Sequence, residues 1–213
     1  METRVLFERK YPDEVLIDES AEVLNHGGII VIPTDTIPGI GCRVDKLKAI
    51  MNLFRLKERP ADLPIPVILA DSIDIEDFAM DIPNVFKPLA DRFWPGALTM
   101  ILKSNGRIPA KIGGGGKTLG FRVPDYPLLR GLVRKLECPL ALTSANPHNY
   151  PPTGLHSSLL GWWNHQVELI ILGQSTVPRP ASAVVNLVDI PPTLLRESTI
   201  DHEELMEMLN RKY

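Results

Sequence analysis

Three consecutive polar residues, Thr34, Asp35 and Thr36, follow closely on an apolar run at residues 29–32. The run has the length and β-branched composition of a strand buried on both faces. Side chains presented at the end of such a strand often bind ligands in proteins that alternate strands and helices. Gly39 and Gly41 follow and are expected to relax the backbone. The three polar residues could equally form only a turn, because Thr and Asp side chains bond to nearby backbone.

A second polar group, Thr143-Ser144-Ala145-Asn146, leaves an apolar run at residues 139–142. Hydroxyl and amide side chains can bind the sugar or phosphate of a nucleotide. They can also cap a turn through bonds to their own backbone. The sequence leaves both interpretations open.

Two cations, Lys57 and Arg59, stand two residues apart just before Pro60. Pro60 disfavours helical geometry at Arg59, so the helix predicted at residues 45–57 ends there and the two side chains can reach one ligand. The alternative is that cations near a helix C-terminus only offset its dipole, an effect of about 0.3–1 kcal/mol.

Basic residues are concentrated between Ile101 and Lys135, where eight lysines and arginines accompany one acid, Asp125. This segment carries a net charge of +7 in a chain whose overall charge is −3. A basic segment in an acidic protein indicates a focused anion site, with a solvated basic face as the alternative. Gly113 to Gly116, within the same segment, forms either a mobile loop or a backbone cradle for an anion.

Composition excludes several classes of protein. Hydrophobic residues make up 44% and charged residues 23% of 213 residues, which is typical of a globular protein. No run approaches the roughly 20 apolar residues of a membrane span, and the first residues lack a secretory signal. Cys42 and Cys138 are too few for a disulfide framework, and no histidine pattern indicates a metal held by the protein. We therefore expect a reduced, cytoplasmic chain.

Hydrophobic periodicity and breakers predict alternating helices and strands. Helices are expected at residues 11–25, 45–57, 86–93, 125–136 and 201–209, with Asp45, Asp125 and Asp201 as caps, and a helical connection at 71–87. Strands are expected at 29–32, 65–69, 97–103, 118–123, 139–142, 169–172, 182–187 and 193–196.

Several segments together resemble the YrdC-like threonylcarbamoyl-AMP synthases, a family that also includes the YciO proteins. They span roughly residues 10 to 200 and stand in the family's order and spacing. The matching pieces are Gly27 to Thr36 with Gly39, Lys57-Glu58-Arg59-Pro60, Phe93 to Thr99, Phe121-Arg122-Val123-Pro124, Thr143 to Asn146, Ser182 to Asn186, and Leu194-Leu195-Arg196.

The resemblance implies one domain over residues 1–213, with an α+β fold in three layers. Its mixed, twisted sheet would be flanked by helices and have a positively charged concave face. The implied reaction condenses L-threonine, bicarbonate and ATP, with Mg²⁺, into threonylcarbamoyl-AMP and pyrophosphate. A downstream transferase would use this product to modify tRNA, and direct RNA contact is a further option.

The resemblance also implies residue roles. Lys57 and Arg59 would be catalytic and bind the triphosphate and the carbamate. Threonine would be bound by Thr34, Arg122 and Ser182. The nucleotide would be bound by Lys57, Arg59, Thr118, Ser144, Asn146 and Arg196.

The chain departs from the family pattern at several positions. Pro38 replaces an aromatic residue, Ser182 to Asn186 lacks a hydroxyl and a carboxylate, and Pro64 to Ile68 lacks a histidine. Gly116 to Gly120 resembles the YciO branch. Two alternatives to the synthase stay open: an RNA-binding module, and a hydrolase of threonylcarbamoyl-AMP.

Overall fold

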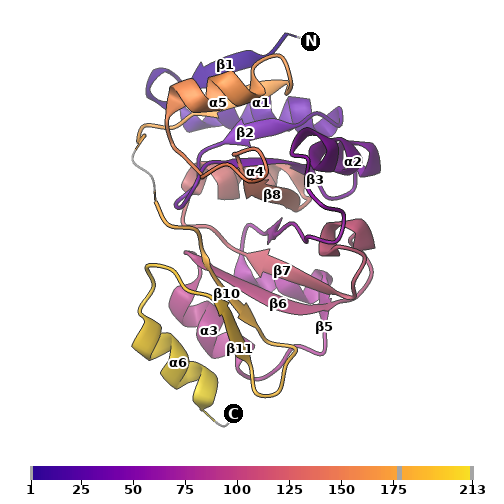
Figure 1. Cartoon of the computed structure of the whole chain (residues 1–213), viewed down its shortest axis with the longest axis vertical. Coiled ribbons are helices and arrows are strands. Elements are labelled where there is room, and N and C mark those ends of the chain that lie inside the picture. Colours follow the sequence, from indigo (N-terminus) through magenta and orange to yellow (C-terminus); the bar gives the residue numbers. More distant parts are fainter. Residues whose placement is uncertain (1, 177–178, 212–213) are drawn as a thin grey trace.

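One mixed sheet organises the chain (Figure 1). The structure is a computed structural model that describes residues 2–176 and 179–211. The strand order is β1-β9-β2-β3-β8-β4-β7-β6-β10-β11, and β5 pairs with β6. The strands are β1 Arg4–Phe7, β2 Ile30–Ile32, β3 Gly39–Arg43, β4 Val67–Ile68, β5 Ala79–Met80, β6 Leu98–Ser104, β7 Thr118–Arg122, β8 Leu140–Ser144, β9 Leu169–Leu172, β10 Ala183–Asn186 and β11 Thr193–Arg196.

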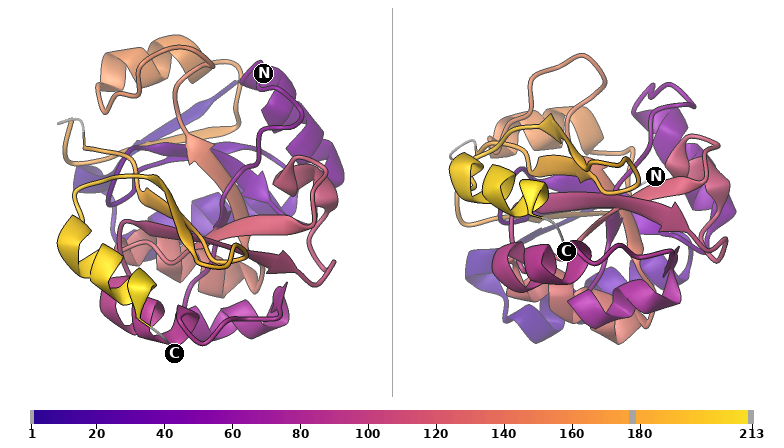
Figure 2. Two further views of the ribbon diagram at one scale, coloured as in Figure 1. Left: turned by 60° about the horizontal axis from the view of Figure 1, so that its bottom comes forward. Right: turned by 90° about the horizontal axis from the view of Figure 1, so that it is seen from below.

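Helices lie on both faces of the sheet (Figure 2). In the view from below, α1, α3 and α4 lie under the sheet, whereas α5 lies above it. The helices are α1 Asp13–Asn25, α2 Leu47–Leu56, α3 Phe86–Phe93, α4 Pro127–Leu136, α5 His156–Trp163 and α6 His202–Asn210, with 3₁₀ turns at Glu8–Lys10, Ser72–Asp77 and Ala110–Gly113. The predicted α+β fold, a mixed sheet flanked by helices, is confirmed. No helix of residues 2–176 and 179–211 has both the length and the apolar character needed to cross a bilayer.

The period of two in the central strands separates the core from a polar face. Met100 of β6 lies opposite Phe121 of β7, and both are fully buried. Their neighbours Thr99 and Arg122 therefore project from the other side of the sheet. Core side chains and polar side chains therefore lie on opposite faces of the same strands.

The sequence missed β1, β3 and β5. In β3 the reason is clear: a Cβ at Gly39 would lie 2.6 Å from the side chain of Leu142, and one at Gly41 would clash with the backbone of Ala141. These glycines permit close approach of β8 and do not relax a loop. The predicted helical connection at residues 71–87 was wrong over most of its length, because a 3₁₀ turn and β5 occupy it.

Helix caps were predicted with mixed success. The Asp201 carboxylate accepts a hydrogen bond from the Glu204 backbone N–H at 3.0 Å and caps α6 as predicted. Asp45 and Asp125 do not cap α2 and α4, whose N-cap residues are Lys46 and Tyr126. Asp45 instead pairs with Arg43 at 2.7 Å, and this charged partner outcompetes the backbone.

Candidate active site

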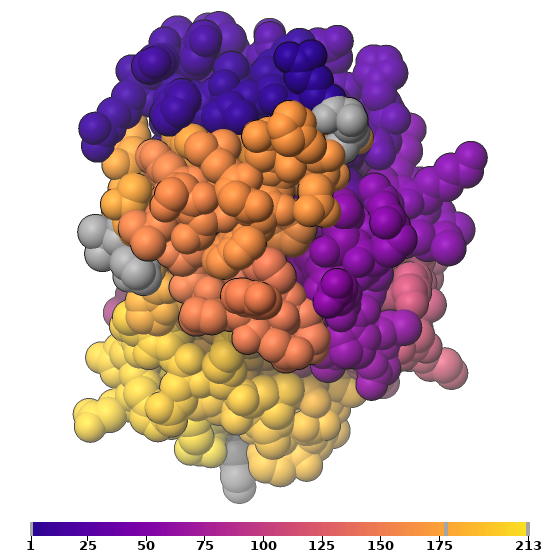
Figure 3. Space-filling model, turned by 45° about the horizontal axis from the view of Figure 1, so that its top comes forward, coloured from indigo at the N-terminus to yellow at the C-terminus, as the bar shows by residue number. Residues whose placement is uncertain are grey.

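The central strands enclose a cavity of about 410 Å³. Among its described lining residues are three arginines and no carboxylate. They come from segments far apart in the sequence: Arg59 after α2, Arg122 at the end of β7 and Arg196 at the end of β11. The space-filling view shows purple, orange and yellow segments, distant in sequence, meeting on one face of the molecule (Figure 3). The cavity is suited to an anion.

Arg122 is held rigidly by three partners. Its Nη2 contacts the Asp35 carboxylate at 2.7 Å, Nη1 donates to the Thr36 hydroxyl at 2.9 Å, and Nε donates to the Gly96 carbonyl at 3.0 Å. Burial lowers the pKa of Arg122, while Asp35 acts in the opposite direction. A guanidinium has five N–H donors, so two remain available for one carboxylate.

Arg196 lies near Arg122 and is fixed by Ser182. Its Nε donates to the Ser182 carbonyl at 2.8 Å and its Nη2 to the Ser182 hydroxyl at 3.3 Å. That hydroxyl is also 2.8 Å from the Thr99 hydroxyl. Burial lowers the pKa of Arg196, and the charge of Arg122 lowers it further. Both effects disfavour positive charge, and a bound anion would relieve them.

Arg59 lines the cavity from the segment that follows α2. Its guanidinium donates to the backbone carbonyls of Leu63 and Pro64 at 3.2 and 2.7 Å. Burial lowers its pKa as well. Carbonyl partners orient the guanidinium without neutralising it, so its charge stays available to a ligand.

Lys57 is buried and is not among the residues that line the cavity. Its Nζ donates to the Ser144 carbonyl, and the His148 backbone N–H donates back to the Lys57 carbonyl at 3.2 Å. Burial lowers the pKa of Lys57 to about 7, and the charge of Arg59 contributes. The ammonium therefore lies directly behind Ser144, which does line the cavity.

Two further polar groups border the same space. The Thr34 hydroxyl donates to the Ile37 carbonyl at 2.9 Å and accepts from the Thr36 backbone N–H at 3.0 Å. Asn146 donates from Nδ2 to the Tyr150 carbonyl at 2.7 Å. Its Oδ1 is buried and has no hydrogen-bond partner in the described part of the chain. An unpartnered buried acceptor is costly, so a ligand N–H or O–H would stabilise it.

Thr118 is the one predicted site residue that the structure places elsewhere. It begins β7, pairs with Lys103 of β6 and lines a different, largely apolar cavity with Lys117. Arg122 stands at the opposite end of β7, beside Ile68 of β4. The structure thus brings together Thr34, Arg59, Arg122, Ser144, Asn146, Ser182 and Arg196, with Lys57 behind them.

The basic segment does not converge on the cavity. Lys103 pairs with Asp81, Arg107 with Asp77, and Lys135 with Asp18. Arg130 and Arg134 share Asp71. Of the eight basic residues between Ile101 and Lys135, Arg122 alone lines the cavity. For the five that form ion pairs, the alternative of a charge-paired surface describes the structure, whereas Lys111 lies over the Phe54 ring and Lys117 lines a separate cavity.

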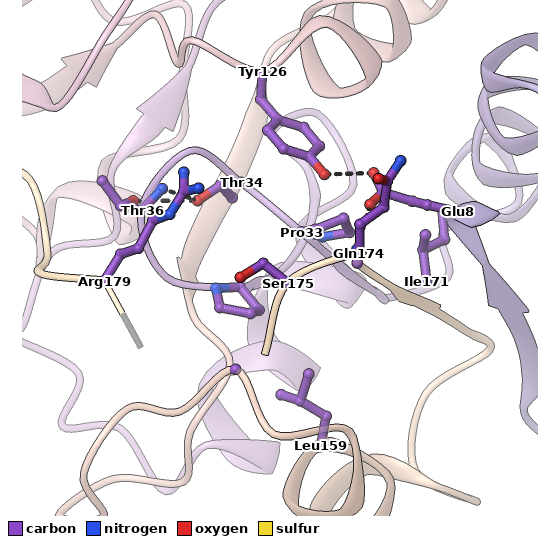
Figure 4. Close-up of a pocket in the computed structure, with 13 residues that line it drawn as sticks. Glu8, Pro33, Thr34, Thr36, Tyr126, Leu159, Ile171, Gln174, Ser175 and Arg179 are labelled. Atoms are coloured by element: carbon purple, nitrogen blue, oxygen red, sulfur yellow. Dashed lines mark hydrogen bonds between the residues drawn. The ribbon is translucent and has the colours of Figure 1, made fainter. Parts of the chain in front are cut away.

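A second cavity, of about 300 Å³, adjoins the first, and Thr34 and Thr36 line both (Figure 4). Pro38, the position that departs from the family pattern, lines this second cavity and not the main one. The sequence reasoning missed three residues here: Asp35 and Thr99, which hold Arg122 and Ser182, and Arg179 in the second cavity. Asp35 belongs to the polar group Thr34-Asp35-Thr36 that the sequence pointed to, but only Thr34 was given a role. Thr99 ends the matched segment Phe93 to Thr99, although no role was assigned to it, and nothing in the sequence distinguishes Arg179.

Comparison with known proteins identifies the family to which this sequence and fold belong. The Sua5/YciO/YrdC family profile, described as "Telomere recombination", matches residues 22–198. The chain belongs to this family. It is 32% identical over 208 residues to the threonylcarbamoyl-AMP synthase of Pyrococcus abyssi, covering 97% of this chain and 61% of that relative. It is 31% identical to the Bacillus subtilis synthase, covering 89% and 55%. The chain thus spans roughly half to three fifths of these relatives.

Solved structures agree with this family membership. The P. abyssi Sua5 structure complexed with L-threonine matches with a TM-score of 0.91 and 30% identity, covering 99% of this chain and 61% of that one. E. coli YciO matches with a TM-score of 0.83 and 25% identity, covering 94% and 97%. Both branches of the family share the fold described here.

Proposed function

We propose that this family member synthesises L-threonylcarbamoyladenylate from L-threonine, bicarbonate and ATP, and so acts as a nucleotidyltransferase. The observation that carries the proposal is the convergence of Arg59, Arg122 and Arg196 on one cavity without a lining carboxylate. The Sua5 structure with L-threonine and the synthase names of the relatives support it. The RNA-binding and hydrolase alternatives are left to the experiment below.

The reaction brings anions together. The threonine amine attacks the bicarbonate carbon, a C–N bond forms, and water leaves to give the carbamate. A carbamate oxygen then attacks the α-phosphorus of ATP, and pyrophosphate departs with the electrons of the broken P–O bond. A catalyst for these steps must mainly position anions and stabilise developing charge, which fixed cations achieve without a protein nucleophile.

The cations in and behind the main cavity form two pairs, Arg122 with Arg196 and Arg59 with Lys57. The charge of Arg122 disfavours the charge of Arg196, and Asp35 forms its ion pair with Arg122. We assign the threonine carboxylate to the two remaining donors of Arg122, with Thr34 and Ser182 as its polar neighbours. Arg196, beside them, faces the nucleotide at the point where the two substrates meet.

Arg59 and Lys57 form the other pair, and the charge of Arg59 contributes to the lowered pKa of Lys57. We assign the triphosphate to them, and the ribose or base to Ser144 and Asn146. The unpartnered Asn146 Oδ1 would accept a hydrogen bond from the nucleotide.

Mg²⁺ enters this proposal with ATP. In residues 2–176 and 179–211, no group of three or more His, Cys, Asp or Glu side chains could hold a metal ion. Mg²⁺ commonly keeps its waters and binds substrate phosphates. We therefore expect the ion to arrive as the Mg²⁺–ATP complex, in which phosphate oxygens and waters would be its main ligands.

The product is a reactive mixed anhydride, which suits direct transfer to a downstream enzyme that modifies tRNA in the cytoplasm. The test is incubation of the protein with ATP, L-threonine and ¹³C-bicarbonate, with pyrophosphate and labelled threonylcarbamoyl-AMP measured. Threonine- and bicarbonate-dependent product supports the synthase. Consumption of added threonylcarbamoyl-AMP without synthesis would instead support a hydrolase. Salt-sensitive RNA binding without either reaction would support the binding module.

A further inference from the structure

The second cavity meets the main one at the loop from Pro33 to Pro38. Thr34 and Thr36 line both cavities, and Asp35, between them in the sequence, bonds to an arginine of each cavity. Its carboxylate holds Arg122 of the main cavity at 2.7 Å, and its backbone carbonyl accepts a hydrogen bond from Arg179 Nη1 at 3.1 Å. A single residue therefore joins the arginines of two neighbouring cavities.

Arg179 is the one arginine or lysine among the described residues that line this second cavity. One of its five N–H groups is donated to the Asp35 carbonyl, and within residues 2–176 and 179–211 it forms no salt bridge. The Asp35 carboxylate is already engaged by Arg122. Arg179 thus brings an unneutralised charge and further donors to the cavity.

The acid in the same cavity is occupied. Glu8 Oε1 accepts from the Tyr126 hydroxyl at 2.5 Å, and Oε2 accepts from the Gln174 backbone N–H at 2.9 Å. Glu8 and Arg179 lie at opposite ends of the cavity in Figure 4. Glu8 thus links its own segment to those of Tyr126 and Gln174. Its carboxylate does not neutralise Arg179, so the Arg179 end of the cavity can bind an anion.

We propose that the Arg179 end of this cavity binds bicarbonate and presents it to the threonine amine across Thr34, an inference that rests on the proposed function. The main cavity supplies cations for the threonine carboxylate and for the triphosphate. Bicarbonate is the remaining anionic reactant, and it must lie beside the amine that attacks it. The Arg179 cavity is positioned for this because it opens onto Thr34, which borders the site assigned to threonine.

The test compares Arg179→Met with wild type by steady-state kinetics, with each substrate varied in turn. Loss of a charge-assisted hydrogen bond should raise the KM for bicarbonate by about 10- to 100-fold. The KM values for threonine and ATP should change less than about twofold, and Arg179→Lys should recover part of the loss. An unchanged KM for bicarbonate, or an equal rise for all three substrates, would overturn the proposal.

Arg9→Met is the matched control. Arg9 donates to the Gln174 carbonyl at 2.9 Å, next to the cavity wall, but does not line the cavity. It should leave the KM for bicarbonate unchanged. Thermal melts of both variants check the fold.

A second readout is independent of catalysis. Wild-type protein should broaden the ¹³C resonance of bicarbonate, and Arg179→Met should not. If wild type makes no product but broadening depends on Arg179, the synthase proposal fails and the anion site stands. If broadening is the same in both proteins, the bicarbonate site fails whatever the activity.

Discussion

Two ion pairs of the same kind lie in very different surroundings. Arg122–Asp35 and Arg107–Asp77 both have an N–O distance of 2.7 Å, and both arginines belong to the basic segment between Ile101 and Lys135. The side chains of the first pair are 9% and 11% exposed, and those of the second 63% and 66%. Exposed pairs contribute about 0–1 kcal/mol, whereas breaking a buried pair costs about 3–5 kcal/mol. Burial, and not distance or residue type, distinguishes the cavity-lining Arg122 from the surface Arg107.

Arg122→Met should have the largest effect. It leaves the Asp35 carboxylate buried without its partner, so the free energy of unfolding should fall by about 3–5 kcal/mol. The kcat/KM for threonine should fall by at least about 100-fold, since charge-assisted hydrogen bonds are lost. Denaturant unfolding and pyrophosphate release measure the two effects. The double variant Arg122→Met/Asp35→Asn separates them, because it should recover stability but not activity.

Lys57 should make ATP binding depend on pH. Its pKa of about 7 means that the protonated fraction falls about tenfold per pH unit above that value, so the KM for ATP should rise between pH 7 and 8.5. Lys57→Met should have a high KM for ATP at every pH. A wild-type KM that is flat over this range would remove Lys57 from the triphosphate site.

The same shift has a consequence for stability. The folded-state pKa of Lys57 lies below its unfolded value, so the unfolded chain binds more protons between about pH 7 and 10.4. The Lys57 contribution to the free energy of unfolding should therefore increase with pH through this window. Denaturant unfolding of wild type and Lys57→Met over this pH range measures the Lys57 contribution as the difference between the two proteins.

Asp35→Asn should have an intermediate effect. An amide can still accept a hydrogen bond from Arg122 but no longer neutralises it, so stability should fall by about 1–3 kcal/mol. The KM for threonine should rise by about tenfold as the guanidinium loses its orientation. A variant that loses stability without any change in KM would show that Asp35 has only a structural role.

Arg107→Met should have the smallest effect, because it removes the exposed ion pair with Asp77 and not the buried pair of Arg122. The free energy of unfolding should change by less than about 0.5 kcal/mol, and kcat/KM should be unchanged. The loss of Arg107 has no effect on Arg122, which bonds to other residues. A large loss of activity in Arg107→Met would mean that the surface cations take part in catalysis after all.

Much of this arrangement could be predicted from local sequence. The apolar stripe of residues 128–136 and the Asp201 cap follow from rules that operate within a few residues. β9 and β11 were predicted with their observed bounds. β3 could not be, since its glycines are explained only by contact with β8, a hundred residues later.

The sequence by itself determined the family, the order of most elements and most of the polar residues that line the cavity, because these depend on short motifs and on the periodicity of apolar residues. The tertiary structure alone decided which of the eight cations between Ile101 and Lys135 faces a cavity, that Thr118 lies apart from the other site residues, and that Pro38 borders a second cavity shared through Thr34. The physical reason is that burial and charge pairing arise between segments distant in the chain, and no local pattern specifies which partner each side chain will meet.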